Sequence, residues 1–85
     1  MESRSFVRQA AVLSSRIPQV QQKVDPEEVK VLREGLQKDL NQLFSGLQNP
    51  TLPCASKLRD LAVANGYTVD SKVQNRLQQA ESYWI

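Results

Sequence analysis

The sequence predicts an all-α protein, a compact bundle of four to five helices that forms a single domain over residues 1–85. Apolar residues recur every three to four positions through four successive segments, which is the period of one helical face. The breaks between these segments carry proline, glycine or asparagine, the residues that typically begin and end helices. A chain of 85 residues is also too short to be divided between two hydrophobic cores.

The first predicted helix is a kinked one over about residues 5–24. Its apolar stripe has alternating spacings of four and three, at Phe6, Ala10, Leu13, Ile17, Val20 and Val24. Pro18 lies within this stripe and removes the backbone hydrogen bond to the carbonyl of Ser14. Because the stripe continues across the proline, we expect a bend, with a split into two short helices as the alternative.

The second predicted helix is long and covers about residues 26–47. Asp25 is a good N-cap, Pro26 suits the first helical position, and two glutamates follow at the positive end of the helix dipole. The apolar stripe then consists of Val29, Leu32, Leu36, Leu40, Leu43, Phe44 and Leu47. Gly35 interrupts it and weakens a helix by roughly 1 kcal/mol relative to alanine. We therefore expect a close helix crossing at Gly35.

A short helix over about 54–64 and a C-terminal helix over about 69–83 complete the predicted bundle. The asparagine–glycine pair at 65–66 predicts a left-handed end to the short helix. Thr68 or Asp70 is the expected N-cap of the last helix. The apolar stripe of that helix consists of Val69, Val73, Leu77, Ala80 and Trp84.

The composition excludes most familiar catalytic chemistry. The chain contains no histidine and one cysteine, Cys54, and it has no glycine-rich phosphate-binding loop. Histidine is the commonest general base and a frequent zinc ligand, and a catalytic thiol needs a neighbouring base or cation. We therefore expect no enzyme activity, no metal, no cofactor and no small-molecule substrate, and we interpret Cys54 as a small core or loop residue.

The charge is mildly positive, with 11 Lys and Arg residues against 9 Asp and Glu residues. A surplus this small does not predict binding to nucleic acid or to an anionic membrane. No apolar run approaches the ~20 residues that a membrane span requires. The single cysteine is typical of intracellular proteins, so the sequence predicts a cytoplasmic location. The first segment is basic and the start of the second is acidic, which is consistent with antiparallel neighbours that attract, although ordinary solvated faces are the interpretation that we favour.

These observations predict a non-catalytic protein–protein interaction module that acts through amphipathic helix surfaces, as an adaptor, an assembly subunit or a regulator. Its partner would be another protein or a second copy of the chain. The candidate anchor residues are Phe6, Leu13, Ile17, Tyr83 and Trp84, because apolar stripes and terminal aromatic residues commonly fill interfaces. The competing interpretation is that the same stripes pack inside the monomer, since so short a chain needs them for its core.

An alternative function is a small DNA-binding regulator. The stretch from Leu58 to Val73 resembles a helix-turn-helix, because the inward-facing Ala62 stands four residues before the turn glycine, Gly66. The element would extend over residues 58–79, and its polar side chains are of types that read bases or contact phosphates. The candidate nucleic-acid-binding residues are Arg59, Lys72, Gln74, Asn75, Arg76 and Gln78. An ordinary helical hairpin with a polar outer face is the interpretation that we favour for this stretch.

Overall fold

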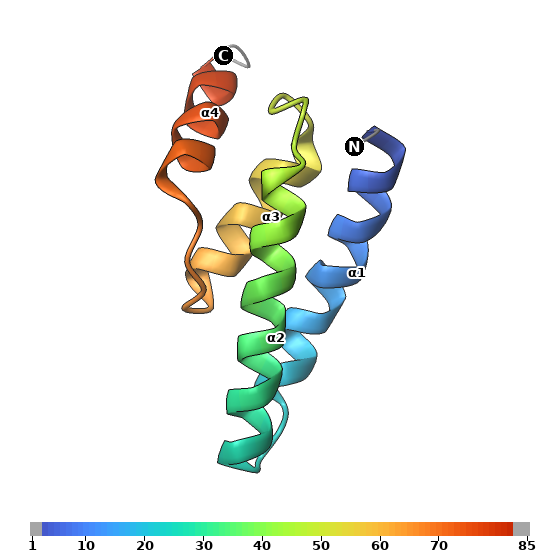
Figure 1. The fold of residues 1–85 in the computed structure, drawn as a ribbon, viewed down its shortest axis with the longest axis vertical. Coiled ribbons are helices and arrows are strands. Elements are labelled where there is room, and N and C mark those ends of the chain that lie inside the picture. Colours follow the sequence, from blue (N-terminus) through green and yellow to red (C-terminus); the bar gives the residue numbers. More distant parts are fainter. Residues whose placement is uncertain (1–2, 83–85) are drawn as a thin grey trace.

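A computed structural model describes residues 3–82, and this part of the chain folds into four helices joined by short connections. The helices are α1 (Ser3–Gln21), α2 (Pro26–Ser45), α3 (Pro53–Ala64) and α4 (Ser71–Glu81). Figure 1 shows α1 and α2 as an antiparallel hairpin, with α3 crossing the hairpin and α4 returning alongside. The molecule measures 42 × 22 × 19 Å. The predicted all-α class is confirmed.

Helix α1 is one continuous helix that ends three residues earlier than the predicted 5–24 segment. It runs through Pro18, which lies in the last turn and is exposed to solvent. Val24 does not belong to the buried stripe, because its side chain is 93% exposed. The chain has to reverse direction before Pro26, and Asp25, the residue before this proline, is held in an extended conformation that ends any helical path from α1. The turn therefore removes Val24 from the helix.

Helix α2 begins as predicted and ends two residues before the end of the predicted 26–47 segment. A side-chain oxygen of Asp25 accepts a hydrogen bond from the backbone N–H of Glu27 at 3.0 Å. Leu47 lies beyond the last helical residue but is still buried. The predicted close crossing at Gly35 is wrong: the residue is exposed, and a Cβ atom placed there would meet nothing within 4 Å.

Helix α3 ends at Ala64, and the turn that follows contains Gly66, the only position among the described residues with a positive φ, at 87°. The N–H of Tyr67 donates to the carbonyl of Ala62 at 2.9 Å, and that of Gly66 donates to the carbonyl of Val63 at 3.1 Å. This pair of bonds is a Schellman motif, which satisfies carbonyls at the end of a helix. Asn65 has a φ of −102°, so the predicted left-handed pair is reduced to the glycine alone.

Helix α4 is shorter than the predicted 69–83 segment, because it begins at Ser71. Of the two predicted caps, Asp70 is the one used, and it accepts a hydrogen bond from the N–H of Lys72 at 2.8 Å. Val69 precedes this cap, so it lies outside the helix although it is buried. Its burial explains why the apolar stripe starts before the helix does.

All four helices contribute side chains to one hydrophobic core. Helix α1 packs against both α2 and α3, and α4 packs against α3. The rings of Phe6 and Phe44 lie 6.2 Å apart between centroids, in a tilted arrangement that aromatic pairs favour. The residues with no exposed surface include Ile17, Leu36, Leu40, Ala55, Leu58, Ala62 and Leu77.

Polar side chains of α2 hold the connection between α3 and α4. The amide of Gln37 donates to the backbone carbonyl of Thr68 and accepts from its N–H, both at 2.8 Å. Arg33 donates to the carbonyl of Asn65 at 2.9 Å. The guanidinium of Arg33 also lies 4.4 Å from the ring centroid of Tyr67, within range of a cation–π interaction. These contacts fix α4 relative to α2 as well as to α3.

Candidate functional site

The predicted partner-binding residues of α1 are part of the core. Phe6, Leu13 and Ile17 are 2%, 5% and 0% exposed. They pack inside the monomer, as the competing interpretation of the stripe expected, and a partner cannot reach Phe6 or Ile17 in this fold. Tyr83 and Trp84, the other predicted anchors, lie outside the described residues.

Arg59, a predicted phosphate contact, is enclosed by other polar side chains. It is 8% exposed, and its Nε atom lies 2.7 Å from a carboxylate oxygen of Asp60. A second nitrogen forms an ion pair with Glu81, which also accepts a hydrogen bond from Ser56. In this fold the charge of Arg59 is covered and paired with two carboxylates, so Arg59 presents no free cation at the surface.

The other predicted nucleic-acid-binding residues lie on α4. Those exposed to solvent include Lys72, Asn75 and Gln78. Gln74 donates to the backbone carbonyl of Val69 at 3.1 Å, and Arg76 donates to that of Leu47 at 3.0 Å. The bond of Gln74 is local to the start of α4, whereas that of Arg76 joins α4 to the chain just after α2. Lys72 and Arg76 are both exposed, lie one helical turn apart on α4 and line the same groove, whereas Arg59 is buried and does not join them.

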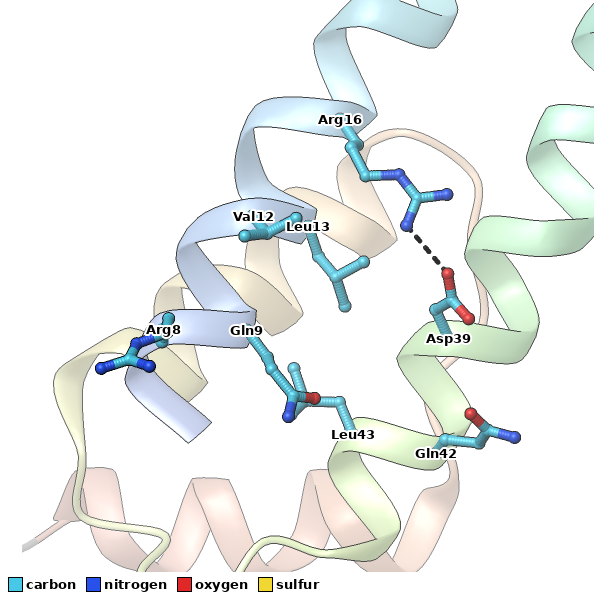
Figure 2. Close-up of a pocket in the computed structure, with 8 residues that line it drawn as sticks. All are labelled: Arg8, Gln9, Val12, Leu13, Arg16, Asp39, Gln42 and Leu43. Atoms are coloured by element: carbon cyan, nitrogen blue, oxygen red, sulfur yellow. Dashed lines mark hydrogen bonds and ion pairs between the residues drawn. The ribbon is translucent and has the colours of Figure 1, made fainter. Parts of the chain in front are cut away.

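A groove of about 440 Å³ lies between α1 and α2. Figure 2 shows its lining residues, with Leu13 pointing from α1 toward α2 and Leu43 facing it from the other helix. These two side chains are almost fully buried, whereas Val12 at the rim is 51% exposed. Apolar surface is thus accessible from solvent here. The complete lining consists of Arg8, Gln9, Val12, Leu13, Arg16, Asp39, Gln42 and Leu43.

Polar and charged side chains border this groove, which we call the α1–α2 groove. Arg16 and Asp39 form an ion pair across it at 2.8 Å, and both side chains are half-buried. Gln9 and Gln42 add neutral polar groups to its edges. Arg8 is exposed and makes no ion pair with another described residue. The groove therefore combines an apolar floor with a rim of excess positive charge.

The packing of α3 explains why the α1–α2 groove is open. Helices α1 and α2 diverge away from their connecting turn (Figure 1). Three fully buried residues of α3, Ala55, Leu58 and Ala62, supply the apolar surface on the side where α3 packs against α1. A third helix thus covers one side of the hairpin, and the opposite side is left without a covering element among the described residues.

A second groove, of about 720 Å³, lies between α2 and α4. Its apolar lining residues, Phe44, Val69 and Val73, are all at most 8% exposed, and no half-exposed apolar side chain comparable to Val12 stands beside them. Asp70 and Lys72 at its edge carry opposite charges. The larger volume is therefore bordered mainly by solvated polar groups, and the smaller α1–α2 groove is the better candidate for an apolar contact.

Of the three predicted anchors on α1, Leu13 also lines the α1–α2 groove, whereas Phe6 and Ile17 do not. The heptad stripe marks the core, while the accessible apolar residues of this helix, Val7 and Val12, lie outside the stripe. The signal in the sequence that could have indicated the groove was an apolar residue outside the stripe, Val12. The opposite wall of the groove comes from α2, and a single helix pattern contains no information about which neighbour stands beside it.

Cys54 is half-buried near the start of α3 and packs against the core. Within residues 3–82 there is no cluster of three or more His, Cys, Asp or Glu side chains arranged to hold a metal ion. None of the described helices combines the length and the apolar character needed to cross a membrane. No protein-family model matches the sequence, and comparisons with curated proteins and with solved structures found no match either.

Proposed function

We propose that this protein is a non-catalytic interaction module that binds apolar side chains of a partner protein in the α1–α2 groove. The observation that carries the proposal is the half-exposed Val12 above the buried pair Leu13 and Leu43. Burial of apolar surface is the main favourable term in most protein association. An open groove between two helices is also a common receptor for an amphipathic segment.

The rest of the described surface supports this choice of groove. The large apolar residues that are exposed elsewhere are Val7, Val24, Val31 and Val63. None of these four lines either groove, and isolated exposed valines are ordinary on protein surfaces. Val12 differs because it adjoins a concave apolar floor. The DNA-binding alternative is not part of the proposal, because Arg59 is buried and paired.

The proposal is tested by site-specific photo-crosslinking in a native lysate. A photoreactive amino acid replaces Val12, and the matched control carries it at Val63, which is similarly exposed, at 48% against 51%, but lies on α3. We expect a discrete crosslinked product from position 12 and none from position 63. Equal labelling at both positions, or no product at position 12, would contradict the proposed site.

Light scattering during size-exclusion chromatography separates the two kinds of partner. If a second copy of the chain fills the groove, the purified protein runs above the monomer mass, and Val12→Ser returns it to the monomer. Because Val12 is half-exposed, this substitution leaves the core intact and is expected to change the free energy of unfolding by less than about 0.5 kcal/mol. Val63→Ser serves as the control for a general change in surface polarity.

A further inference from the structure

We infer that the occupant of the α1–α2 groove is an acidic amphipathic helix of another protein. This inference rests on the proposed function and adds the chemistry of the partner. It follows from the distribution of charge on α1, from the neutralisation of the one acidic residue that lines the groove, and from the helical geometry of both walls.

Helix α1 carries three arginines and no acidic residue from Ser3 to Gln21. Two of them, Arg4 and Arg8, are exposed and make no ion pair with another described residue. They lie one helical turn apart, so they occupy the same face. The first turn of α1, as described from Ser3 onward, contains no acidic side chain.

The opposite wall of the α1–α2 groove, formed by α2, does not neutralise the positive charge of α1. Asp39 is the acidic residue in the lining of the α1–α2 groove, and it is paired with Arg16 at 2.8 Å. Arg8 is then left as the unpaired charge of the lining, and Arg4 extends the positive surface toward the start of α1. A partner with carboxylates beside its apolar residues would match this rim, whereas one with lysines would be repelled.

The groove geometry favours a helical occupant. Both walls of the groove are helices, and the side of the α1–α2 hairpin opposite the groove is already covered by α3. A helix laid into the open side would meet the hairpin as a further member of the bundle, with apolar residues at three- and four-residue spacing against Val12, Leu13 and Leu43. Its acidic residues would lie toward Arg4 and Arg8.

A second copy of this chain fits the rim less well. The protein has a net charge of +2, so two copies repel overall. The glutamates of the first turn of α2, Glu27 and Glu28, stand next to the α1–α2 turn, and Glu28 is already paired with Lys23 at 3.5 Å. Self-association is therefore an outcome that the test has to detect rather than the arrangement that we infer.

Three fluorescent peptides of about five helical turns, roughly 18 residues each, test the inference. All three share one leucine pattern at three- and four-residue spacing, and the flanking positions are glutamate, glutamine or lysine. Fluorescence anisotropy is measured with the full chain at ionic strengths of about 0.01 M and 0.15 M. We expect the glutamate peptide to bind about tenfold or more tightly than the lysine peptide at low salt, and the difference to shrink at the higher salt.

Charge reversal at the rim supplies the specific control. Arg8→Glu should reverse the preference between the glutamate and lysine peptides. Lys57→Glu should leave it unchanged, because Lys57 is exposed on α3 and does not line the groove. Both positions are exposed, so thermal unfolding of the two variants is expected to match that of the original protein.

The outcomes separate the inference from the proposed function. Equal binding of all three peptides, abolished by Val12→Ser, overturns the acidic partner while the groove retains its proposed role. Concentration-dependent self-association that Val12→Ser removes also overturns it, in favour of a second copy. Absence of binding by any peptide overturns the inference, and if photo-crosslinking at position 12 also yields no product, the proposed function fails as well.

Discussion

Single side chains of α2 decide where the connection between α3 and α4 lies. Gln37 pairs both of its amide groups with the backbone of Thr68, and Arg33 reaches Asn65 and the face of Tyr67. The sequence does not reveal these contacts, because glutamine and arginine on a helix usually extend into solvent. Their partners are backbone groups distant in sequence, and only the folded chain brings them within hydrogen-bonding distance.

Tyr67 shows the opposite situation, a polar group without a partner. Its hydroxyl is buried and makes no hydrogen bond within the described part of the chain. A buried hydroxyl without a partner is costly, while its removal can be neutral or favourable. We expect Tyr67→Phe to leave the free energy of unfolding unchanged or to raise it by up to about 1 kcal/mol in urea denaturation.

The control for this prediction is Tyr67→Leu, which also removes the ring that lies beneath Arg33. This variant should be less stable than Tyr67→Phe, because the cation–π contact and part of the packing are lost. A loss of more than about 1 kcal/mol in Tyr67→Phe would show that the hydroxyl has a stabilising partner in solution.

At the scale of the elements, the helix ends were predictable because the signals are local. Asp25 and Asp70 cap their helices through side-chain oxygens that accept backbone N–H groups two residues later. These bonds depend only on neighbouring residues, so the sequence contains the information. Val24 and Val69 were placed inside helices because the apolar period continues through them, although local turns exclude both from the helices.

Gly35, inside α2, and Gly66, in the turn after α3, should respond to alanine in opposite directions. Gly35 lies inside α2 with open space around it, so Gly35→Ala is expected to stabilise the protein by about 0.5–1 kcal/mol. Gly66 has a φ of 87°, and a Cβ atom there would stand 2.9 Å from a terminal nitrogen of Arg33. Gly66→Ala should therefore destabilise it by about 1–2 kcal/mol.

Thermal or urea unfolding of the two variants provides the measurement, and each is the matched control for the other. The substitution is identical, and only the backbone conformation and the surroundings differ. If Gly35→Ala is instead less stable, the result would support the close helix crossing that the sequence predicts at this position. An unchanged stability in Gly66→Ala would show that the turn relaxes to a conformation that alanine tolerates.

At the scale of the whole molecule, a polar cluster joins the first half of α3 to the end of α4. Ser56 and Arg59 both contact the carboxylate of Glu81, and Ser56 and Arg59 are at most 8% exposed. The hydrogen bond from Ser56 and the charge and hydrogen bond of Arg59 hold the pKa of Glu81 below its ordinary value of 4.5. The ionised form is therefore favoured in the folded state.

This shift predicts how acid affects stability. A carboxyl group with a lowered pKa in the folded protein contributes stability above its ordinary pKa, and the contribution is lost as the pH falls through the folded value. Glu81→Gln should thus be less stable than the original protein at neutral pH, and the difference should shrink as the pH falls below 4.5 and through the lowered pKa of Glu81. Urea denaturation across this range measures it, with the exposed Glu34→Gln as control. A difference that does not change with pH would contradict the role of the charge.

The sequence by itself determined the all-α class, the four helical segments and most residues of the core stripes, Val24 being an exception. Each of these depends on residue period and on capping groups within a few positions of one another. The accessible groove was decided only by the tertiary structure. Whether Val12 faces solvent or a neighbour depends on how α2 and α3 pack around α1, and the same arrangement buries Arg59 and leaves Arg8 exposed. A pattern along one helix identifies the face that must be buried, but the packing of the other helices determines which remaining face stays accessible.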